Sequence, residues 1–221
     1  MKAFFYSIFL CLVGSIVFAQ NKPTTVDDYF LQLPEQYLTH IPLADRVNVL
    51  KAKSLAEAVE HTKSSFFVEI LDRPNGYMKV SSAWDGEHCS YELVFWKKSD
   101  QSHLIGLSQT TSGVRNDNLS SLSFFSLKNQ VWQKVENISP LFHLKDFIDE
   151  KDFKNIPDDF KEYVHNPPIT ISLPRKGKNI MVEVSSVVVE EDLKIPLSKI
   201  KYSKYDLVWN DGKFIKSEGK R

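Results

Sequence analysis

Apolar and polar positions follow three patterns along the chain, and each pattern predicts a different kind of segment. A continuous apolar run over residues 3–17 is followed by helical spacing between residues 26 and 61, and alternation begins at Phe66. A spacing of 3.6 is typical of a helix with one buried face, and a spacing of two is typical of a strand. The order predicts a leader, then helices, then antiparallel strands.

The apolar run at the start has the features of an export signal. It ends in small residues at the two positions that a signal peptidase reads, so we expect a signal peptide over 1–19, cleaved between Ala19 and Gln20. The alternatives are a membrane anchor and a lipid anchor on Cys11. The run is shorter than the roughly 20 residues that span a bilayer, and no small residue directly precedes Cys11. The protein is therefore expected to be secreted or periplasmic.

Two helical segments are expected after a short polar lead. The first begins near residues 25–28, where threonine and aspartate side chains can accept hydrogen bonds from free backbone amides. The second is expected as one helix over residues 43–61. Its partial apolar stripe consists of Val47, Leu50, Leu55 and Val59. We expect this stripe to face the core.

Alternating segments separated by turn-forming residues predict the strands. They occupy residues 66–70, 77–79, 91–95, 104–107, 122–127, 131–135, 169–173, 179–189, 205–209 and 213–215. The last two join at Asp211-Gly212, a strong signal for a tight hairpin, because a left-handed backbone costs little there. Residues 141–165 are charged and read as helical. Antiparallel sheets with helices on one face are the expected α+β fold class.

A weak internal repeat suggests how these elements are organised. Residues 125–136 align with residues 207–218 in their large apolar positions, their turn and their Lys-x-Glu ending. The simplest account is a tandem repeat, with one unit of helices and antiparallel sheet over 20–139 and another over 140–221. The alternative is that any two amphipathic hairpins look alike. We expect the two units to pack as one compact body.

Composition and charge exclude several classes of protein. The chain has 221 residues with 28 basic and 28 acidic side chains, and 42% of its residues are hydrophobic. Long disorder and a charge-driven nucleic-acid binder are therefore not expected. Loss of Lys2 with the leader leaves a net charge of about −1. Cys89 is then the single cysteine, so no internal disulfide is expected, and no mature segment approaches a transmembrane length.

Three short stretches resemble a known family. They are DYFLQLPEQYL at residues 28–38, RVNVL at 46–50 and VWNDGKF at 208–214. They resemble a family of uncharacterised secreted proteins from gut-type anaerobic Gram-negative bacteria, a domain of unknown function. The resemblance implies a tandem α+β architecture similar to that of the β-lactamase inhibitory protein. It implies a fold and a compartment, and it provides no catalytic residue.

Catalytic and metal-binding patterns are sparse. The chain contains no Gly-x-Ser-x-Gly elbow, phosphate loop or dinucleotide fingerprint. A metal could use Glu87, His88 and Cys89 with His103, but neighbours on a strand point to opposite faces. We therefore expect no metal, no cofactor and no catalytic residues, with Cys89 as a small core residue.

The expected turn after residue 84 is the candidate binding site. Trp84 can supply apolar contact, and Asp85, Glu87 and His88 can supply a polar rim. The alternative, which is more frequent for a tryptophan at a sheet edge, is that Trp84 closes the core.

These features favour a non-catalytic binding or protein-interaction module that acts outside the cytoplasm. The expected partner is an unknown protein or an envelope glycan, and not a nucleic acid. The alternative is an envelope-associated hydrolase acting on glycan or peptide. A convergent acid–base or nucleophile–base set would favour the hydrolase, and a sheet surface without one would favour binding.

Overall fold

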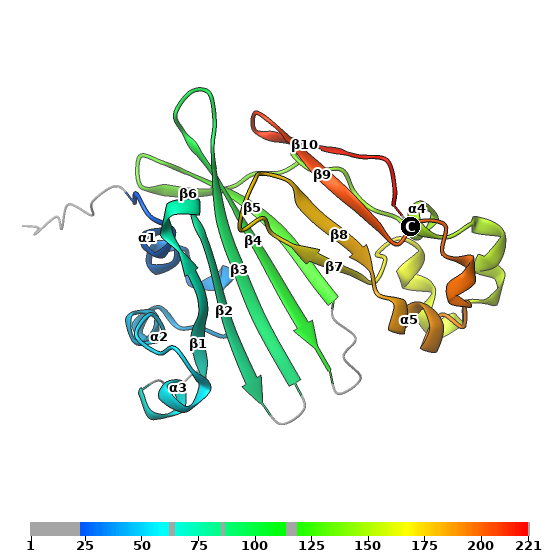
Figure 1. Ribbon diagram of the computed structural model, residues 1–221, viewed down its shortest axis with the longest axis horizontal. Helices are drawn as coiled ribbons and strands as arrows, with labels where there is room; N and C mark the ends of the chain where they lie inside the picture. Colours follow the sequence, from blue (N-terminus) through cyan, green and yellow to red (C-terminus); the bar gives the residue numbers. More distant parts are fainter. Residues whose placement is uncertain (1–22, 62–64, 85–86, 114–118, 221) are drawn as a thin grey trace, which may run out of the picture.

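The computed structural model describes residues 23–61, 65–84, 87–113 and 119–220, and the structural statements below refer to these residues. Within them, ten strands form two antiparallel sheets with short helices around them (Figure 1). The chain is therefore a mixed α+β protein, which confirms the coarse expectation from the spacing patterns. The expected leader over residues 1–19 lies outside the described residues.

The larger sheet is a meander in which each strand pairs with the next one along the chain. Its strands are β1 (Phe66–Asp72), β2 (Tyr77–Trp84), β3 (Glu87–Lys97), β4 (His103–Ser112), β5 (Leu119–Lys128) and β6 (Val131–Lys134). The register between β3 and β4 is continuous from His88 to Lys97, whereas β1 contains an irregularity between Val68 and Ile70. These strands confirm those predicted from alternation in this half of the chain.

The smaller sheet lies across one face of the larger sheet, with β7 nearest to β4 and β5 (Figure 1). In spatial order its strands are β10 (Lys213–Lys216), β9 (Lys204–Asn210), β8 (Ile180–Val184) and β7 (Ile169–Ser172). Hydrogen bonds at β7 join the sheets directly. The Ser108 hydroxyl donates to the Ile171 carbonyl at 3.0 Å, and the Leu173 amide donates to the Glu92 carboxylate at 2.6 Å.

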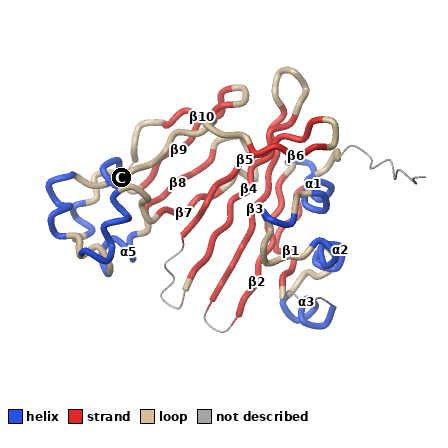
Figure 2. The backbone as a smooth tube through the Cα atoms, turned by 180° about the vertical axis from the view of Figure 1, so that it is seen from behind, coloured by secondary structure: helices blue, strands red, loops and turns tan. Residues whose placement is uncertain are grey.

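Short N-terminal helices cover the opposite face of the larger sheet (Figure 2). They are α1 (Val26–Gln32), η1 (Glu35–Tyr37), η2 (Leu43–Asp45), α2 (Arg46–Val49) and α3 (Leu55–His61), and a further turn, η3 (Arg73–Asn75), joins β1 to β2. The start of α1 is a capping box, in which Thr25 accepts from the Asp28 amide and Asp28 accepts from the Thr25 amide. This start agrees with the one predicted from the sequence.

Arg46 holds these helices together from inside the core. Its side chain is fully buried. Its guanidinium donates to the carbonyl oxygens of Phe30 at 3.0 Å, of Ile41 at 3.4 Å and of Leu33. Carbonyls at the end of a short helix have no partner within the helix. The charged group therefore satisfies backbone oxygens that would otherwise be buried without a donor.

The single helix expected over residues 43–61 is wrong. The segment is divided into η2, α2 and α3, and most of its apolar stripe faces outward: Val47 is 51% exposed and Val59 64% exposed. The buried positions are instead Val49, Ala52 and Ala58. The small Ala52 lets the backbone approach β1, where its carbonyl accepts from the Val68 amide at 2.9 Å. The side of this segment that faces the sheet is therefore the side with small residues, which allow close backbone contact. The spacing of the large apolar residues did not predict it.

The second helical region also differs in part from expectation. Residues 141–165 form α4 (Leu144–Phe147), η4 (Glu150–Asn155) and η5 (Asp158–Val164), so this region is helical but mostly in tight 3₁₀ turns. The strand expected over 179–189 ends at Val184, because Ser185 caps a helix, α5 (Ser186–Glu191). The turn η6 (Leu197–Lys199) follows. Val188 and Val189 are buried, so their β-branched character gave a misleading strand signal.

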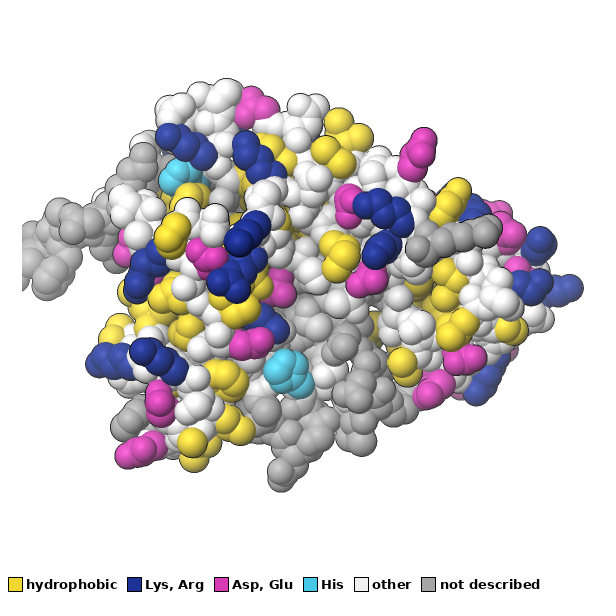
Figure 3. Space-filling view, viewed as in Figure 1, with side chains coloured by type: hydrophobic (Ala, Val, Ile, Leu, Met, Phe, Trp, Pro, Cys, Tyr) yellow, Lys and Arg dark blue, Asp and Glu magenta, His cyan; other side chains and the backbone are white. Residues whose placement is uncertain are grey.

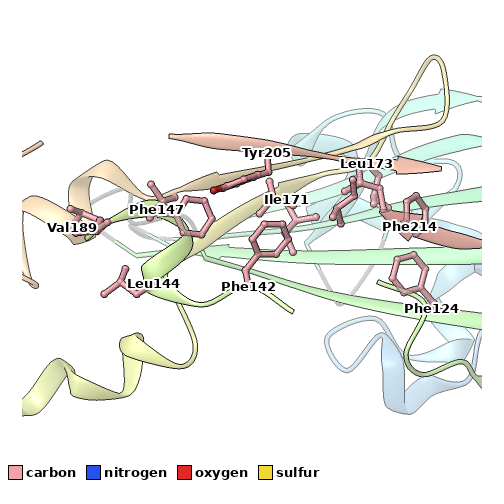
Figure 4. Packing of buried hydrophobic residues seen from close by; sticks show 14 of the residues in the cluster. Phe124, Phe142, Leu144, Phe147, Ile171, Leu173, Val189, Tyr205 and Phe214 are labelled. Carbon is pink, nitrogen blue, oxygen red and sulfur yellow. The ribbon is translucent and has the colours of Figure 1, made fainter. Parts of the chain in front are cut away.

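Two hydrophobic cores flank the larger sheet, because alternate residues of each strand face opposite sides. On the helix side, Met78, Leu93, Ile105 and Phe125 pack under α1 and the turns after it. On the other side, residues of the larger sheet pack against the smaller sheet, as Figure 4 shows for the packing of Phe124 and Phe214. This sheet–sheet core continues into the helical region around α4 and α5.

Trp96 joins the two sheets. It is buried, stacks on Trp209 with ring centroids 5.6 Å apart, and meets Phe214 edge-on at 5.1 Å. Its indole N–H donates to the Lys178 carbonyl at 2.9 Å. A Cβ atom on Gly106 would lie 2.6 Å from the Trp96 ring, so the glycine makes room for this side chain. Trp96 is therefore a core residue.

The last hairpin of each sheet has the same geometry. Leu127 lies opposite Trp132 in β5–β6, and the residues aligned with them, Trp209 and Phe214, lie opposite each other in β9–β10. Both hairpins turn on two residues with positive φ, namely Asn129 and Gln130 in the first and Asp211 and Gly212 in the second. The tight turn predicted at Asp211-Gly212 is confirmed.

Candidate functional site

The expected binding tip lies at the end of the β2–β3 hairpin. Trp84 and Glu87 form the last backbone pair of that hairpin, but their side chains and all of Asp85 lie outside the described residues. His88 is half-buried. It shares a sheet face with Ser90 and Glu92, because every second residue of β3 points to the same face and the register of this strand is continuous. Of the four predicted residues, the structure thus places the side chain of His88 alone.

His88 and Cys89 point to opposite faces, as strand alternation predicts. His88 lies opposite Ala83, and Cys89 lies opposite Ser82. His103 is at the far end of β4, where the Tyr29 hydroxyl lies 2.5 Å from its Nδ1 atom. The described residues contain no group of three or more histidines, cysteines or carboxylates placed to hold a metal ion. The one sequence-local set of ligand types therefore does not converge.

Cys89 has the environment of a structural thiol. It is half-buried beside a cavity of about 500 Å³ that Phe66 and His40 also line. Burial raises the pKa of the Cys89 thiol. A raised pKa keeps the sulfur protonated, whereas a nucleophilic cysteine needs a lowered one.

On the face of the larger sheet that the smaller sheet partly covers, the side chains outside the covered part are polar. Glu69 accepts from the Ser81 hydroxyl at 2.5 Å and from the Lys79 ammonium at 3.0 Å. Burial alone raises the pKa of Glu69, but the hydrogen bonds from Ser81 and Lys79 outweigh it, so this pKa is lowered. His88 belongs to the same face. In Figure 3, basic, acidic and histidine side chains border a shallow hollow near the middle of the molecule. On this face, Glu69 is bound by Ser81 and Lys79 and is partly exposed, so it is a structural group and not part of a buried catalytic set.

A cavity of about 540 Å³ opens between the two sheets beside β5. Its apolar lining comes from both sheets and from the segment after β6: Leu122, Phe124, Phe142, Ile169, Ile171, Val182 and Leu207. Its polar lining includes Ser120, His143, His165 and Asn166. An apolar cavity with a few polar groups at its mouth is the usual form of a ligand site.

The two histidines at this cavity lack the partners of a catalytic pair. The rings of His143 and His165 meet edge-on, with centroids 6.5 Å apart. The His143 side chain accepts from the Asp146 amide in a capping box. Asp146 itself accepts from the His143 amide at 2.9 Å and from Lys216 at 2.7 Å. Within the described chain, neither imidazole is hydrogen-bonded to a hydroxyl or a thiol, so no nucleophile–base pair is formed here.

Asp146 is held as a charged structural group. Partial burial on its own raises the pKa of this carboxyl, but the hydrogen bonds from the His143 amide and from Lys216 outweigh it, and the pKa lies below its usual range. The carboxylate therefore caps α4 and binds Lys216 at neutral pH. It does not orient an imidazole.

The outer edge of β5 runs along the mouth of this cavity. The Val135 amide donates to the Phe124 carbonyl at 2.8 Å, so Phe124 turns its backbone groups toward the β6 side. Backbone groups alternate in direction along a strand, so Leu122 and Ser120 turn theirs the same way. In the described chain, β6 pairs with β5 only from Phe125 to Lys128. The edge beside Ser120 and Leu122 is therefore not paired by any described strand.

Sequence reasoning missed this site. Its lining is drawn from segments between residues 120 and 207, so no local motif marks it. The available signal was the composition of β5, LSSLSFFSLK. Its first eight residues are uncharged and consist only of serines and large apolar side chains, which is unusual for a strand edge facing water.

Comparison with known proteins supports the fold and leaves the function open. No protein family and no curated protein matches the chain. A solved structure, described as a domain of an uncharacterized protein from Porphyromonas gingivalis W83, is similar with a TM-score of 0.53 and 14% sequence identity. The similarity covers 87% of this chain and 97% of that one. At this level of identity, the similarity shows a shared fold alone.

Proposed function

We propose that this protein is a non-catalytic binding or protein-interaction module that acts in the periplasm or outside the cell. The observation that carries the proposal is the open cavity of about 540 Å³ between the sheets, lined by apolar and polar side chains, next to a strand edge that no described strand pairs with. Among the residues that the structure describes, the histidines of this cavity form no nucleophile–base pair. Such a site offers contact area and backbone hydrogen bonds, which serve recognition.

The compartment rests on the expected signal peptide. If residues 1–19 are removed, the protein begins at Gln20. Mass spectrometry of the protein from the cell envelope or medium tests this. A protein that accumulates in the cytosol with residues 1–19 attached would contradict it.

A tandem architecture is the second part of the proposal. The matched register of the β5–β6 and β9–β10 hairpins and their similar two-residue turns support descent from one unit. Helices also precede each sheet, over residues 26–61 and 144–164. The proposed units are residues 20–139 and 140–221, in an arrangement similar to that of the β-lactamase inhibitory protein. In that arrangement the sheet surface and hairpin ends would bind.

The partner is proposed to be a protein or an envelope glycan. The test is to immobilise the purified protein and to measure retention of envelope proteins and of purified envelope glycans separately, with heat-unfolded protein as the control. Retention of either class by the folded protein alone supports the proposal. Release of new sugar or peptide ends during the incubation would favour the hydrolase alternative. Retention of neither would remove the proposal.

The β2–β3 tip is proposed as a separate contact, consisting of Trp84, Asp85, Glu87 and His88. One substitution distinguishes an anchor from a core residue. Trp84→Ala leaves the melting temperature almost unchanged if Trp84 faces solvent, and it lowers stability by about 3–5 kcal/mol if Trp84 is core. A large loss of stability would remove Trp84 from the site.

A further inference from the structure

The outer edge of β5 lacks the features that normally protect a strand edge. Protected edges have charged side chains, prolines or bulges, or are covered by other chain segments. Residues 119–124, LSSLSF, contain no charged residue and no proline, and the register along them is regular. The β1 strand, by contrast, has an irregularity between Val68 and Ile70 and receives the Ala52 carbonyl. At β10, the Phe214 amide donates to the Ile138 carbonyl.

The free edge presents its backbone groups at a fixed spacing. Ser120 and Leu122 direct N–H and C=O groups outward, by the alternation that begins at Phe124. Equivalent groups along a strand repeat every two residues, about 7 Å. An extended polypeptide carries donors and acceptors at the same spacing, whereas a glycan does not. The chemistry of the edge therefore favours a peptide over a glycan.

The cavity determines which side chains such a peptide would carry. Ser120, Leu122 and Phe124 face the smaller sheet, because they lie opposite Thr110, Ser108 and Gly106 on the same face. A residue opposite Leu122 would therefore direct its side chain into the apolar cavity, and its two neighbours would face away. The cavity thus selects an apolar side chain at every second position.

The protein's own chain pairs with the β5 edge in this way at Phe124, two residues from Leu122. Val135 follows β6, its amide pairs with the Phe124 carbonyl, and its side chain packs against the sheet–sheet core. The chain then turns away, because Ile138 pairs with Phe214 of β10. The positions beside Leu122 and Ser120 continue the line of β6, and the described chain forms no backbone hydrogen bond to the outward groups of these two residues. A second peptide would continue that strand.

We infer that an extended, uncharged peptide segment of another protein binds as an added strand at the outer edge of β5, with alternate apolar side chains in the cavity between the sheets. The inference rests on the proposed binding function and specifies its partner as polypeptide. The charged residues that line the cavity, Lys134 and Glu136, are exposed and pair with each other at 3.2 Å. We therefore expect the affinity to come from shape and backbone pairing, and not from a charge on the peptide. Strand addition of this kind relies on main-chain hydrogen bonds, with pockets for alternate side chains.

The test begins with a phage-displayed library of linear peptides selected on the protein in the form that the producing cell accumulates. Selected peptides are synthesised, and their Kd is measured by fluorescence anisotropy. We expect sequences with apolar residues at alternate positions. Each backbone N–H of the best peptide is then methylated in turn. We expect loss of binding with a period of two, by about tenfold at every second position.

The matched protein variants are Ser120→Pro and Ser120→Ala. Both remove the hydroxyl that lies 2.7 Å from Thr110 Oγ1, but only proline removes the outward N–H, and proline is tolerated where that group faces solvent. We expect Ser120→Pro to weaken peptide binding about tenfold and Ser120→Ala by less than about twofold. Urea unfolding midpoints verify that both variants are folded. If Ser120→Pro is unstable, the methylation series on the unaltered protein decides the question.

Several results would overturn the inference. They are a methylation series without a period of two, equal affinities of the folded proline and alanine variants, and a library that yields no binder. Sedimentation that shows a dimer abolished by Ser120→Pro would assign the edge to a second copy instead. The binding function itself would survive these results if envelope proteins or glycans are still retained. It would fall only if neither class is retained.

Discussion

One face of the larger sheet is closed by helices, whereas the other is only partly covered by a second sheet. On the helix side, a fully buried Arg46 joins the ends of short helices, and the core beneath is formed by large apolar residues such as Phe30 and Phe125. On the sheet side, Trp96 and Phe214 form a dense contact, but a cavity of about 540 Å³ remains at the β5 edge.

Under the proposed function, this difference places stability and binding on opposite faces of one sheet. Adjacent residues of the same strand, such as Phe124 and Phe125, serve different cores because strand side chains alternate. A surface covered by a second sheet can leave a gap wherever the second sheet is narrower than the first. Here the larger sheet has six strands and the smaller has four. The helix side therefore stabilises the fold, and in our proposal the open margin of the sheet side is the surface that binds a partner.

The largest expected effect tests whether the sheet side is a true core despite its cavity. Trp96→Ala removes the stack on Trp209 and the hydrogen bond to the Lys178 carbonyl. We expect a loss of about 4 kcal/mol in unfolding free energy, measured with urea. A loss below about 1 kcal/mol would show that the two sheets are only loosely joined.

The next effect tests the closure of the helix side. Arg46→Met keeps most of the side-chain volume but leaves the carbonyls of Phe30, Leu33 and Ile41 without their donor. We expect a loss of about 3 kcal/mol in unfolding free energy. The matched control is Arg73→Met, which removes an exposed ion pair with Asp27 and costs less than about 1 kcal/mol. Equal losses would contradict a structural role for Arg46.

A smaller effect compares the two hairpin turns. Gly212 has φ of +96°, and Gln130 occupies the equivalent position with φ of +64°. Because positive φ favours glycine, Gly212→Ala is expected to lower stability by about 1 kcal/mol, and Gln130→Gly to raise it by up to about 1 kcal/mol. Both changes are measured as shifts in the urea midpoint. Effects of the same sign at both turns would show that the turns are not equivalent.

The smallest effect is a pH dependence at the junction of the sheets. Burial raises the pKa of Glu92, and the hydrogen bond from the Leu173 amide and the charge of Lys79 offset only part of that rise. A carboxyl with a raised folded pKa destabilises the fold as pH rises from its ordinary value through the folded one. The unfolding free energy of the unaltered protein minus that of Glu92→Gln should therefore fall as pH rises from about 4 to 7.

Glu69→Gln is the matched control with the opposite sign. Burial alone raises the pKa of Glu69, but hydrogen bonds from Ser81 and Lys79 outweigh it, so the pKa is lowered. The contribution of Glu69 is present above its ordinary pKa and is lost as pH falls through the folded value. Urea midpoints of both variants, each relative to the unaltered protein and measured from about pH 3 to pH 7, should shift in opposite directions, with the Glu69 effect in the lower part of the range. If both variants showed the same pH dependence, the opposite pKa shifts of Glu92 and Glu69 would be contradicted.

The sequence predicted the strands better than the helices, and it did not predict the cavity. Alternation and Asp211-Gly212 identified the sheets because these signals are local. The segment 43–61 was misread because Val47 and Val59 face solvent while Ala52 and Ala58 are buried, a choice made by backbone packing. The cavity joins residues from β5 to β9, and only the packing of one sheet on another brings them together. The tip at Trp84 stays a prediction.

Amide hydrogen exchange along β5 tests the central claim most directly, because it reports the open edge residue by residue. The amides of Ser121 and Ser123 face β4, and those of Ser120 and Leu122 face outward. In the free protein, measured by NMR, we predict that Ser120 and Leu122 exchange at least about tenfold faster than Ser121 and Ser123. Saturation with the selected peptide should slow the outward pair to the rate of the inward pair. Four amides that exchange alike, or an outward pair that the bound peptide leaves fast, would contradict the account.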